Sequence, residues 1–137
     1  MRIQEGYGLE TGIKGKQTKV VTAECTAKAM GSGSMDVFAT PAMIALMEET
    51  AWKSVAAALD PGYGTVGIRL EVTHDAPTPL GTVVTCESEL LQVDGRKLTF
   101  EVRAYDETGC IGKAVHERFI VEEETFMEKA LCRGHQK

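Results

Sequence analysis

Two adjacent carboxylates, Glu48 and Glu49, lie in a segment with the pattern of a helix, and helical geometry separates them. At about 100° per residue, Glu48 projects from the apolar side of the helix, whereas Glu49 lies on the opposite side, four residues before Lys53. That spacing is typical of an exposed ion pair. A carboxylate among apolar residues is poorly hydrated, which suits proton transfer or nucleophilic attack. Glu48 is therefore a candidate catalytic residue. The alternative is that it lies at the edge of the apolar stripe or pairs with an arginine from the sheet.

His74 ends a run in which Val66, Ile68, Leu70 and Val72 alternate with other residues, so strand periodicity directs its side chain toward the core. The prolines that follow must end the strand. His74 thus lies where a strand gives way to a loop, a common place for functional residues. The residue is a candidate acid or base, although a lone inward histidine is more often structural than catalytic.

Thr40 precedes Pro41 at the head of the same helix, a position that N-terminal capping explains. Eight residues of helix rise about 12 Å, so Thr40 and Glu48 cannot touch unless the first turn is distorted. The two residues could instead flank an elongated ligand or meet across a subunit interface. His116 and Arg118 share one face of a later predicted strand, and Glu117 lies on the other. Both histidine and arginine fit an ordinary exposed strand surface.

Periodicity also predicts the elements that position these residues. A helix is expected over 40–59, with Thr40 as its N-cap and Asp60-Pro61-Gly62 as its stop. Alternating apolar residues predict strands at 65–74, 82–91, 97–105 and 111–121, preceded by a β-branched strand candidate at 19–25. Asp94-Gly95 indicates a hairpin, and a short helix is expected to begin near Glu123. This order predicts an α+β fold in which a long helix packs on one face of an antiparallel sheet.

The length of 137 residues fits a single domain over 1–137. No segment approaches the 18 or so apolar residues of a membrane span, and no export signal follows the N-terminus, so we expect a cytoplasmic protein. A net charge of −5 argues against a general nucleic-acid binder, although local arginines could hold a small anionic ligand. The chain has no GxSxG, P-loop, GxGxxG or HExxH motif, and its four isolated cysteines predict no metal site.

Three segments together resemble one known family. The stretches FATPAMIALMEETA, GTVGIRLEVTHDAPTP and GKAVHERFIV are similar, in order and spacing, to the fluoroacetyl-CoA thioesterase family of hot-dog proteins, over roughly residues 37–121. The resemblance implies a helix wrapped by an antiparallel sheet, a homodimer, and acyl-CoA bound near the subunit interface. It implies no cofactor, because CoA is part of the substrate.

The resemblance also implies roles for individual residues. The family's catalytic threonine, glutamate and histidine fall on Thr40, Glu48 and His74. Gly67 would let the backbone approach an acyl carbonyl, and Arg118 would contact the CoA end or the acyl pocket. One segment departs from the family. Where the fluoroacetyl-specific enzyme has lid phenylalanines, this chain reads Gly-Ser-Gly-Ser-Met at 31–35, so we expect a different or broader range of short acyl groups.

The resulting hypothesis is hydrolysis of a short-chain acyl-CoA. Glu48 would activate water or form a transient anhydride, His74 would act as acid and base or polarise the carbonyl, and Thr40 would orient or take part in the attack. A backbone N–H near Gly67 would stabilise the oxyanion. Two alternatives remain open: a binding protein that keeps the pocket without turnover, and a hot-dog hydratase or dehydratase.

Overall fold

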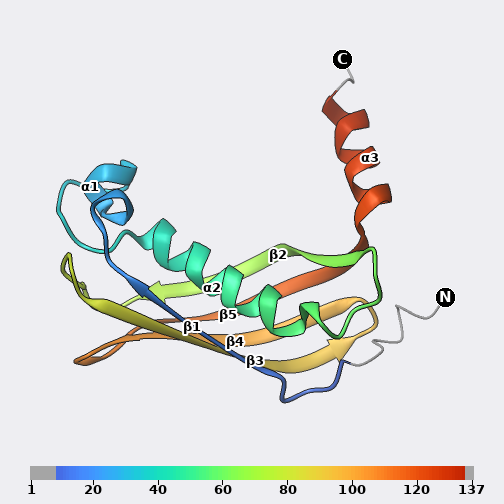
Figure 1. The fold of residues 1–137 in the computed structure, drawn as a ribbon, viewed down its shortest axis with the longest axis horizontal. Coiled ribbons are helices and arrows are strands. Elements are labelled where there is room, and N and C mark those ends of the chain that lie inside the picture. Colours follow the sequence, from blue (N-terminus) through green and yellow to red (C-terminus); the bar gives the residue numbers. More distant parts are fainter. Residues whose placement is uncertain (1–8, 135–137) are drawn as a thin grey trace.

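The computed structural model describes residues 9–134 (Figure 1). Its strands are β1 (Lys14–Val20), β2 (Tyr63–His74), β3 (Val83–Asp94), β4 (Lys97–Asp106) and β5 (Gly109–Glu122). Its helices are α1 (Ala27–Met30), α2 (Thr40–Ala56) and α3 (Glu123–Gly134), with a 3-10 turn at Ala23–Cys25. The predicted helix and the four strands after it are all present.

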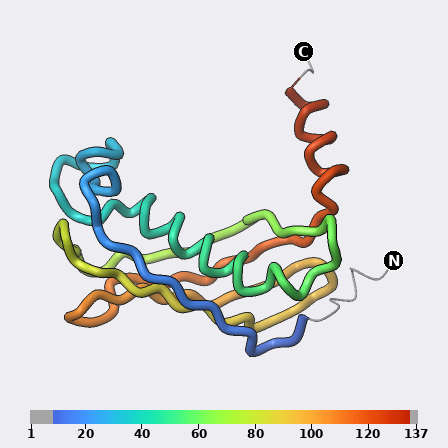
Figure 2. The backbone as a smooth tube through the Cα atoms, viewed as in Figure 1, coloured from blue at the N-terminus to red at the C-terminus, as the bar shows by residue number. Residues whose placement is uncertain are grey.

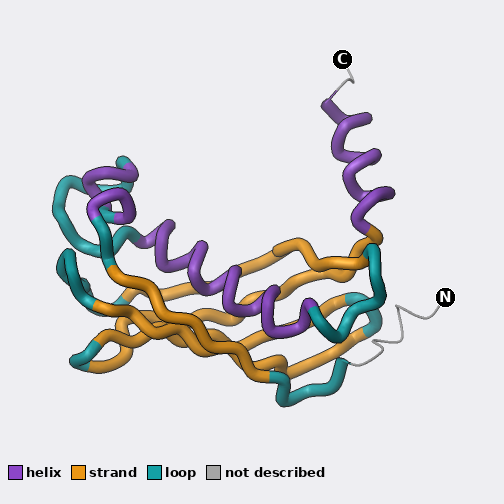
Figure 3. The backbone as a smooth tube through the Cα atoms, in the orientation of Figure 1, coloured by secondary structure: helices purple, strands orange, loops and turns teal. Residues whose placement is uncertain are grey.

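The five strands form one antiparallel sheet in the order β1-β3-β4-β5-β2. Helix α2 lies across one face of this sheet and contacts β1, β2, β3 and β4 (Figures 1 and 3). This arrangement confirms the predicted α+β fold. In the described part of the chain, strands β1 and β2 are the two edges, so the strand that carries His74 has a hydrogen-bonded neighbour there on one side only.

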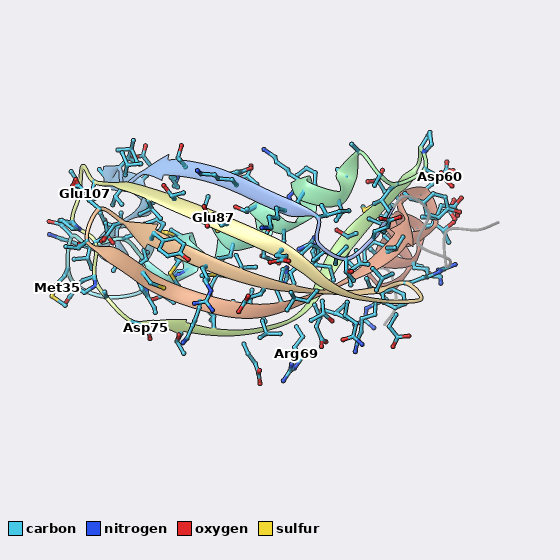
Figure 4. All side chains as sticks on the ribbon, turned by 90° about the horizontal axis from the view of Figure 1, so that it is seen from below. Met35, Asp60, Arg69, Asp75, Glu87 and Glu107 are labelled. Atoms are coloured by element: carbon cyan, nitrogen blue, oxygen red, sulfur yellow. The ribbon has the colours of Figure 1, made fainter. Side chains whose placement is uncertain are left out.

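The core lies between α2 and the sheet because each contributes one apolar face. From the helix, Met43, Met47 and Val55 are fully buried, and they meet sheet residues such as Leu98 and Phe100. The other face of the sheet is open, and it mixes charged side chains such as Lys113 with exposed apolar ones such as Val115 and Phe119. Figure 4 looks onto that face, where the labelled Glu87 lies over β3. The hairpin between β3 and β4 turns at Gly95, whose φ of 62° suits glycine, as the Asp94-Gly95 pair predicted.

Most predicted boundaries differ from the structure by one to three residues, and the first strand differs by more. Helix α2 ends at Ala56, and residues 57–59 form a tighter turn in which the N–H of Ala58 donates to the carbonyl of Val55. The first strand lies at Lys14–Val20, not 19–25. Its polar, lysine-rich sequence lacks apolar alternation because it is an exposed edge strand, which such residues protect from further pairing. Helix α1 was not predicted.

Strand β2 contains a β-bulge, which corrects the predicted alternation along it. The register with β5 shifts between Gly67 and Arg69, leaving Ile68 as the additional residue, with 51% of its surface exposed. After the bulge, Leu70, Val72 and His74 are partly buried as expected. Ile68 therefore does not share the inward face with Leu70, and the residues before the bulge change faces. Gly67 is the residue that this shift places opposite Arg118.

Helix α3 begins at Glu123 as predicted and stands away from the sheet (Figure 2). None of its residues is buried, and Phe126, Met127 and Leu131 are exposed. Within residues 9–134, no helix is long and apolar enough to cross a membrane.

Candidate active site

Thr40 and His74 form a hydrogen-bonded pair where the start of α2 meets the end of β2. The Thr40 Oγ1 lies 2.7 Å from the His74 Nδ1. The predicted capping role of Thr40 is wrong: the N-cap is Ala39, Thr40 is the first helical residue, and no side chain caps this end. Its hydroxyl is directed at the imidazole instead. Pro41, which lacks an N–H, reduces the need for a cap.

The His74 imidazole has an unusual environment for a polar ring. Its Nε2 is buried and has no hydrogen-bond partner among residues 9–134. Burial lowers the pKa of His74 below its ordinary value, and the nearby Asp75 charge offsets this only in part. The ring is therefore neutral near pH 7, with one nitrogen on the Thr40 hydroxyl and the other available to a further group. A hydroxyl beside a neutral imidazole is the arrangement that general acid–base chemistry requires.

A surface hollow adjoins this pair. Its lining includes Ala27, Ser32, Phe38 and Pro77, together with Thr40 and His74. Phe38 itself belongs to the core, with 1% of its surface exposed, whereas residues 31–36 are exposed. The labelled Met35 and Asp75 lie at the same end of the molecule, and Asp60 lies at the other (Figure 4).

Glu48 lies about two turns further along α2, beside Gly67 and Arg118. Its Oε2 is 3.5 Å from the Arg118 Nη1 and would be 2.6 Å from a Cβ on Gly67. The Glu48 side chain keeps 43% of its surface exposed, so it is not a carboxylate sealed among apolar residues. The alternative interpretation, an ion pair with an arginine from the sheet, is confirmed. Glu49 forms the predicted exposed pair with Lys53, at 2.8 Å.

Arg118 is buried and held by its whole guanidinium group. Its Nε donates to the Thr65 Oγ1 at 2.8 Å and its Nη2 to the Thr65 carbonyl at 3.0 Å, while its Nη1 lies 3.0 Å from the His116 Nε2. An exposed strand surface is therefore the wrong interpretation for His116 and Arg118, which retain 1% and 6% exposure. These contacts fix the cation beside Glu48.

Sequence reasoning missed His116 and Thr65 as members of this cluster. In β5 the row Gly112, Ala114, His116, Arg118 and Ile120 alternates with Lys113, Val115, Glu117, Phe119 and Val121. Both rows mix apolar and charged residues, so periodicity alone could not decide which row faces inward. The pairing with β2 decides it in the structure, because the bulge brings Gly67, which has no side chain, opposite Arg118.

The structure thus brings the predicted residues into two groups within one chain. Thr40 and His74 form the first, while Glu48, Gly67 and Arg118 form the second. The eight helical residues between Thr40 and Glu48 correspond to about 12 Å, and the helix is regular from Thr40 onward. Among residues 9–134, no group of three or more His, Cys, Asp or Glu side chains is placed to hold a metal ion.

Known proteins share this arrangement of helix and sheet. The family model described as fluoroacetyl-CoA-specific thioesterase, FlK, matches residues 21–124. The fluoroacetyl-CoA thioesterase of Streptantibioticus cattleyicolor is 43% identical over 94 residues, which cover 69% of this chain and 68% of that protein.

Solved structures agree with this match. A crystal structure of a point mutant of the fluoroacetyl-CoA-specific thioesterase FlK superposes with a TM-score of 0.86 at 34% identity, covering 92% of this chain and 98% of that one. A Thermus thermophilus protein described as a thioesterase superfamily member gives 0.80 at 28% identity, covering 90% of each chain. A hot-dog-like protein from Thermanaerovibrio acidaminovorans, at 23% identity and a TM-score of 0.87, supports the fold alone. The chain therefore belongs to the fluoroacetyl-CoA-specific thioesterase family and is a thioester hydrolase of the hot-dog fold.

Proposed function

We propose that the protein hydrolyses short-chain acyl-CoA thioesters to the free acid and CoA, at two equivalent sites in a homodimer. In each site, Thr40 and His74 of one subunit act together with Glu48 of the partner subunit. The observation that carries this proposal is the Thr40–His74 hydrogen bond, next to a buried His74 Nε2 that has no partner among residues 9–134. A buried polar atom without a partner is costly unless another group supplies one.

The exposed edge of β2 offers a way to bring the Thr40–His74 pair close to a Glu48 group. This strand is 12 residues long, pairs with β5 on one side, and carries both Gly67 and His74. A long open edge is a ready surface for a second copy, and a two-fold pairing is self-complementary. With the two-fold axis near Leu70 and Glu71, midway between Gly67 and His74, the Glu48 group of each subunit would approach the Thr40–His74 pair of the other.

The chemistry needs only the side chains of such a composite site. Water adds to the thioester carbonyl and gives its proton to a carboxylate or imidazole base. The tetrahedral oxyanion is stabilised by a backbone N–H near Gly67. The C–S bond then breaks, and the CoA thiolate takes the proton back from the base that accepted it from water. In the alternative route, Glu48 attacks the carbonyl directly and water hydrolyses the resulting anhydride. No cofactor or metal enters either route.

The acyl group is expected to be short but not restricted to fluoroacetyl. Structures of the relative FlK include complexes with fluoroacetate and CoA and with acetyl-CoA. In this chain the hollow beside Thr40 and His74 is bordered by Ala27 and Ser32, and residues 31–36 contain no aromatic side chain. A site with small residues at its mouth should accept several small acyl groups. We expect Arg118 to contact the substrate near Glu48, and we expect the protein to work in the cytoplasm.

The test is thiol release from acetyl-, propionyl-, butyryl- and fluoroacetyl-CoA by the wild type, with Glu48→Gln and His74→Ala beside it. We expect the wild type to release CoA from several of the four, and each variant to lose roughly 10²-fold or more in kcat. If the wild type releases CoA from none of them, the proposed function is wrong. If Glu48→Gln retains the wild-type rate, the assignment of Glu48 is wrong although the function stands.

A further inference from the structure

His116 is a buried titratable group close to Glu48 that the proposed chemistry does not use. It lies in β5 with 1% of its surface exposed, in the same inward row as Arg118. Its imidazole has two polar contacts, one from each nitrogen: Nδ1 lies 3.0 Å from the Arg69 carbonyl oxygen, and Nε2 lies 3.0 Å from the Arg118 Nη1.

These two contacts determine the protonation state of the ring. A carbonyl oxygen can only accept a hydrogen bond, so the Nδ1 must carry the proton and donate it to Arg69. A guanidinium can only donate, so the Nε2 must present its lone pair to Arg118. Only the neutral ring with the proton on Nδ1 satisfies both neighbours. A protonated ring would place an N–H against an N–H, and two cations 3.0 Å apart.

The backbone of β2 anchors His116 through the carbonyl of Arg69. Arg69 directly follows the bulge residue Ile68, and its carbonyl is the acceptor for His116. Bulges commonly redirect groups next to active sites. The contacts then run from the β2 backbone to His116, from His116 to Arg118, and from Arg118 to Glu48, where the last distance is 3.5 Å. Arg118 is held on its other side by Thr65.

We propose that His116 is a positioning residue, which holds the Arg118 guanidinium in place and thereby orients the Glu48 carboxylate. This inference rests on the proposed function, because it assigns His116 to the same site. The role requires the lone pair of Nε2 and not only the volume of the ring. Loss of that acceptor frees Nη1 of a buried cation, which then moves toward Glu48 or toward solvent, and the carboxylate moves with it.

Two variants separate the two contacts of His116. In His116→Gln, the longer side chain can place its amide oxygen near the position of Nε2 and accept from Arg118. In His116→Asn, the shorter amide can donate to the Arg69 carbonyl but does not reach Arg118. Ile120→Val is the matched stability control, because Ile120 is fully buried in the same row of β5 and carries no polar group.

The experiment combines kinetics with a direct view of Arg118. We expect His116→Asn to lower kcat by roughly 10- to 100-fold, because small displacements of a reacting group are costly. The kcat of His116→Gln should stay within a few-fold of the wild-type value. Ile120→Val should keep the wild-type kcat even if its melting temperature falls as much as that of His116→Asn. In an Arg118→Ala background, His116→Asn should change kcat no further.

The side-chain N–H resonance of Arg118 gives a readout that does not depend on turnover. In ¹⁵N-labelled full-length protein, we expect the Nε–H signal to be alike in the wild type and His116→Gln, and to be shifted or broadened in His116→Asn. The inference is overturned if His116→Asn keeps the wild-type kcat, or if its Arg118 signal is unchanged. If the wild type itself releases no CoA, the proposed function fails, and the Arg118 signal alone then decides the role of His116.

Discussion

At the scale of single residues, the site depends on close contacts that leave no space for a larger side chain. Gly67 is the clearest case. A Cβ at this position would lie 2.6 Å from the Glu48 Oε2, 3.3 Å from the His116 ring and 3.4 Å from the Arg118 Nη1. The observed neighbour of Gly67 is thus a carboxylate of the site, in addition to any acyl carbonyl that its backbone approaches.

Gly67→Ala is therefore expected to displace the Glu48 side chain and lower kcat by roughly 10- to 100-fold. Gly64→Ala is the matched control, because its Cβ would also meet a carboxylate oxygen, that of Glu123 at 2.5 Å, at the base of α3. Thiol release should be measured for both variants. Equal losses of activity in the two, or no loss in Gly67→Ala, would contradict the role given to Gly67.

The half-buried His74 and the buried His116 predict how stability depends on pH. Burial lowers the pKa of both His74 and His116 below the ordinary 6.5, so the unfolded chain binds more protons than the folded one as the pH falls. The stabilisation of the folded state by these two neutral histidines is fully present above about pH 6.5, and it is lost progressively as the pH falls below that value. The groups that face His116 are the Arg118 cation, which lowers its pKa further, and the Arg69 carbonyl and Glu48, which raise it.

Melting temperatures between pH 8 and pH 5 test this linkage. We expect the wild type to lose stability on the acid side, and His116→Gln to lose less, because glutamine does not titrate. Equal slopes in the two proteins would mean that His116 contributes nothing to the pH dependence.

At the scale of elements, the start of α2 is held without a side-chain cap. Thr40 uses its hydroxyl for His74, so Thr40→Ala should change the free energy of unfolding by less than about 0.5 kcal/mol, whereas a lost cap costs about 1 kcal/mol. Thr26 is the contrasting case, because its Oγ1 does accept from the N–H of Ala29 at the start of α1.

Denaturant titration of the two alanine variants checks this difference. Thr26→Ala should be clearly less stable than the wild type while retaining its activity, and Thr40→Ala should be nearly as stable but impaired in thiol release. A loss of about 1 kcal/mol in Thr40→Ala would contradict the small role in stability that is expected for Thr40, and would mean that its hydrogen bond to His74 stabilises the fold.

The elements also separate what sequence could predict from what it could not. Helical geometry placed Glu48 and Glu49 on different sides, and the Asp94-Gly95 turn and the following strands were found because local rules govern them. The bulge at Ile68 could not be found, because one additional residue leaves the apolar alternation looking unbroken while the side chains before it change faces. The burial of His116 and Arg118 depends on that bulge, through the residue that β2 places opposite them.

At the scale of the whole molecule, the open edge of β2 is the feature on which the proposed composite site depends. Ile68 is exposed on this edge, and Val20 is similarly exposed on β1, the opposite edge. A charge on an edge strand opposes pairing with another chain. Ile68→Lys should therefore shift the protein toward monomer and lower its activity in parallel, whereas Val20→Lys should do neither. Light scattering and thiol release on the same samples would reject the β2 interface if Ile68→Lys remained an active dimer.

The central claim is that Glu48 of one subunit works with Thr40 and His74 of the other, and subunit mixing tests it most directly. Glu48→Gln and His74→Ala homodimers should each be nearly inactive. After the two are unfolded together and refolded at equal amounts, half of the dimers should be mixed, and each mixed dimer should contain one intact site of two. The account predicts recovery of about a quarter of the wild-type rate of thiol release. A mixture no more active than the two variants measured separately would contradict it.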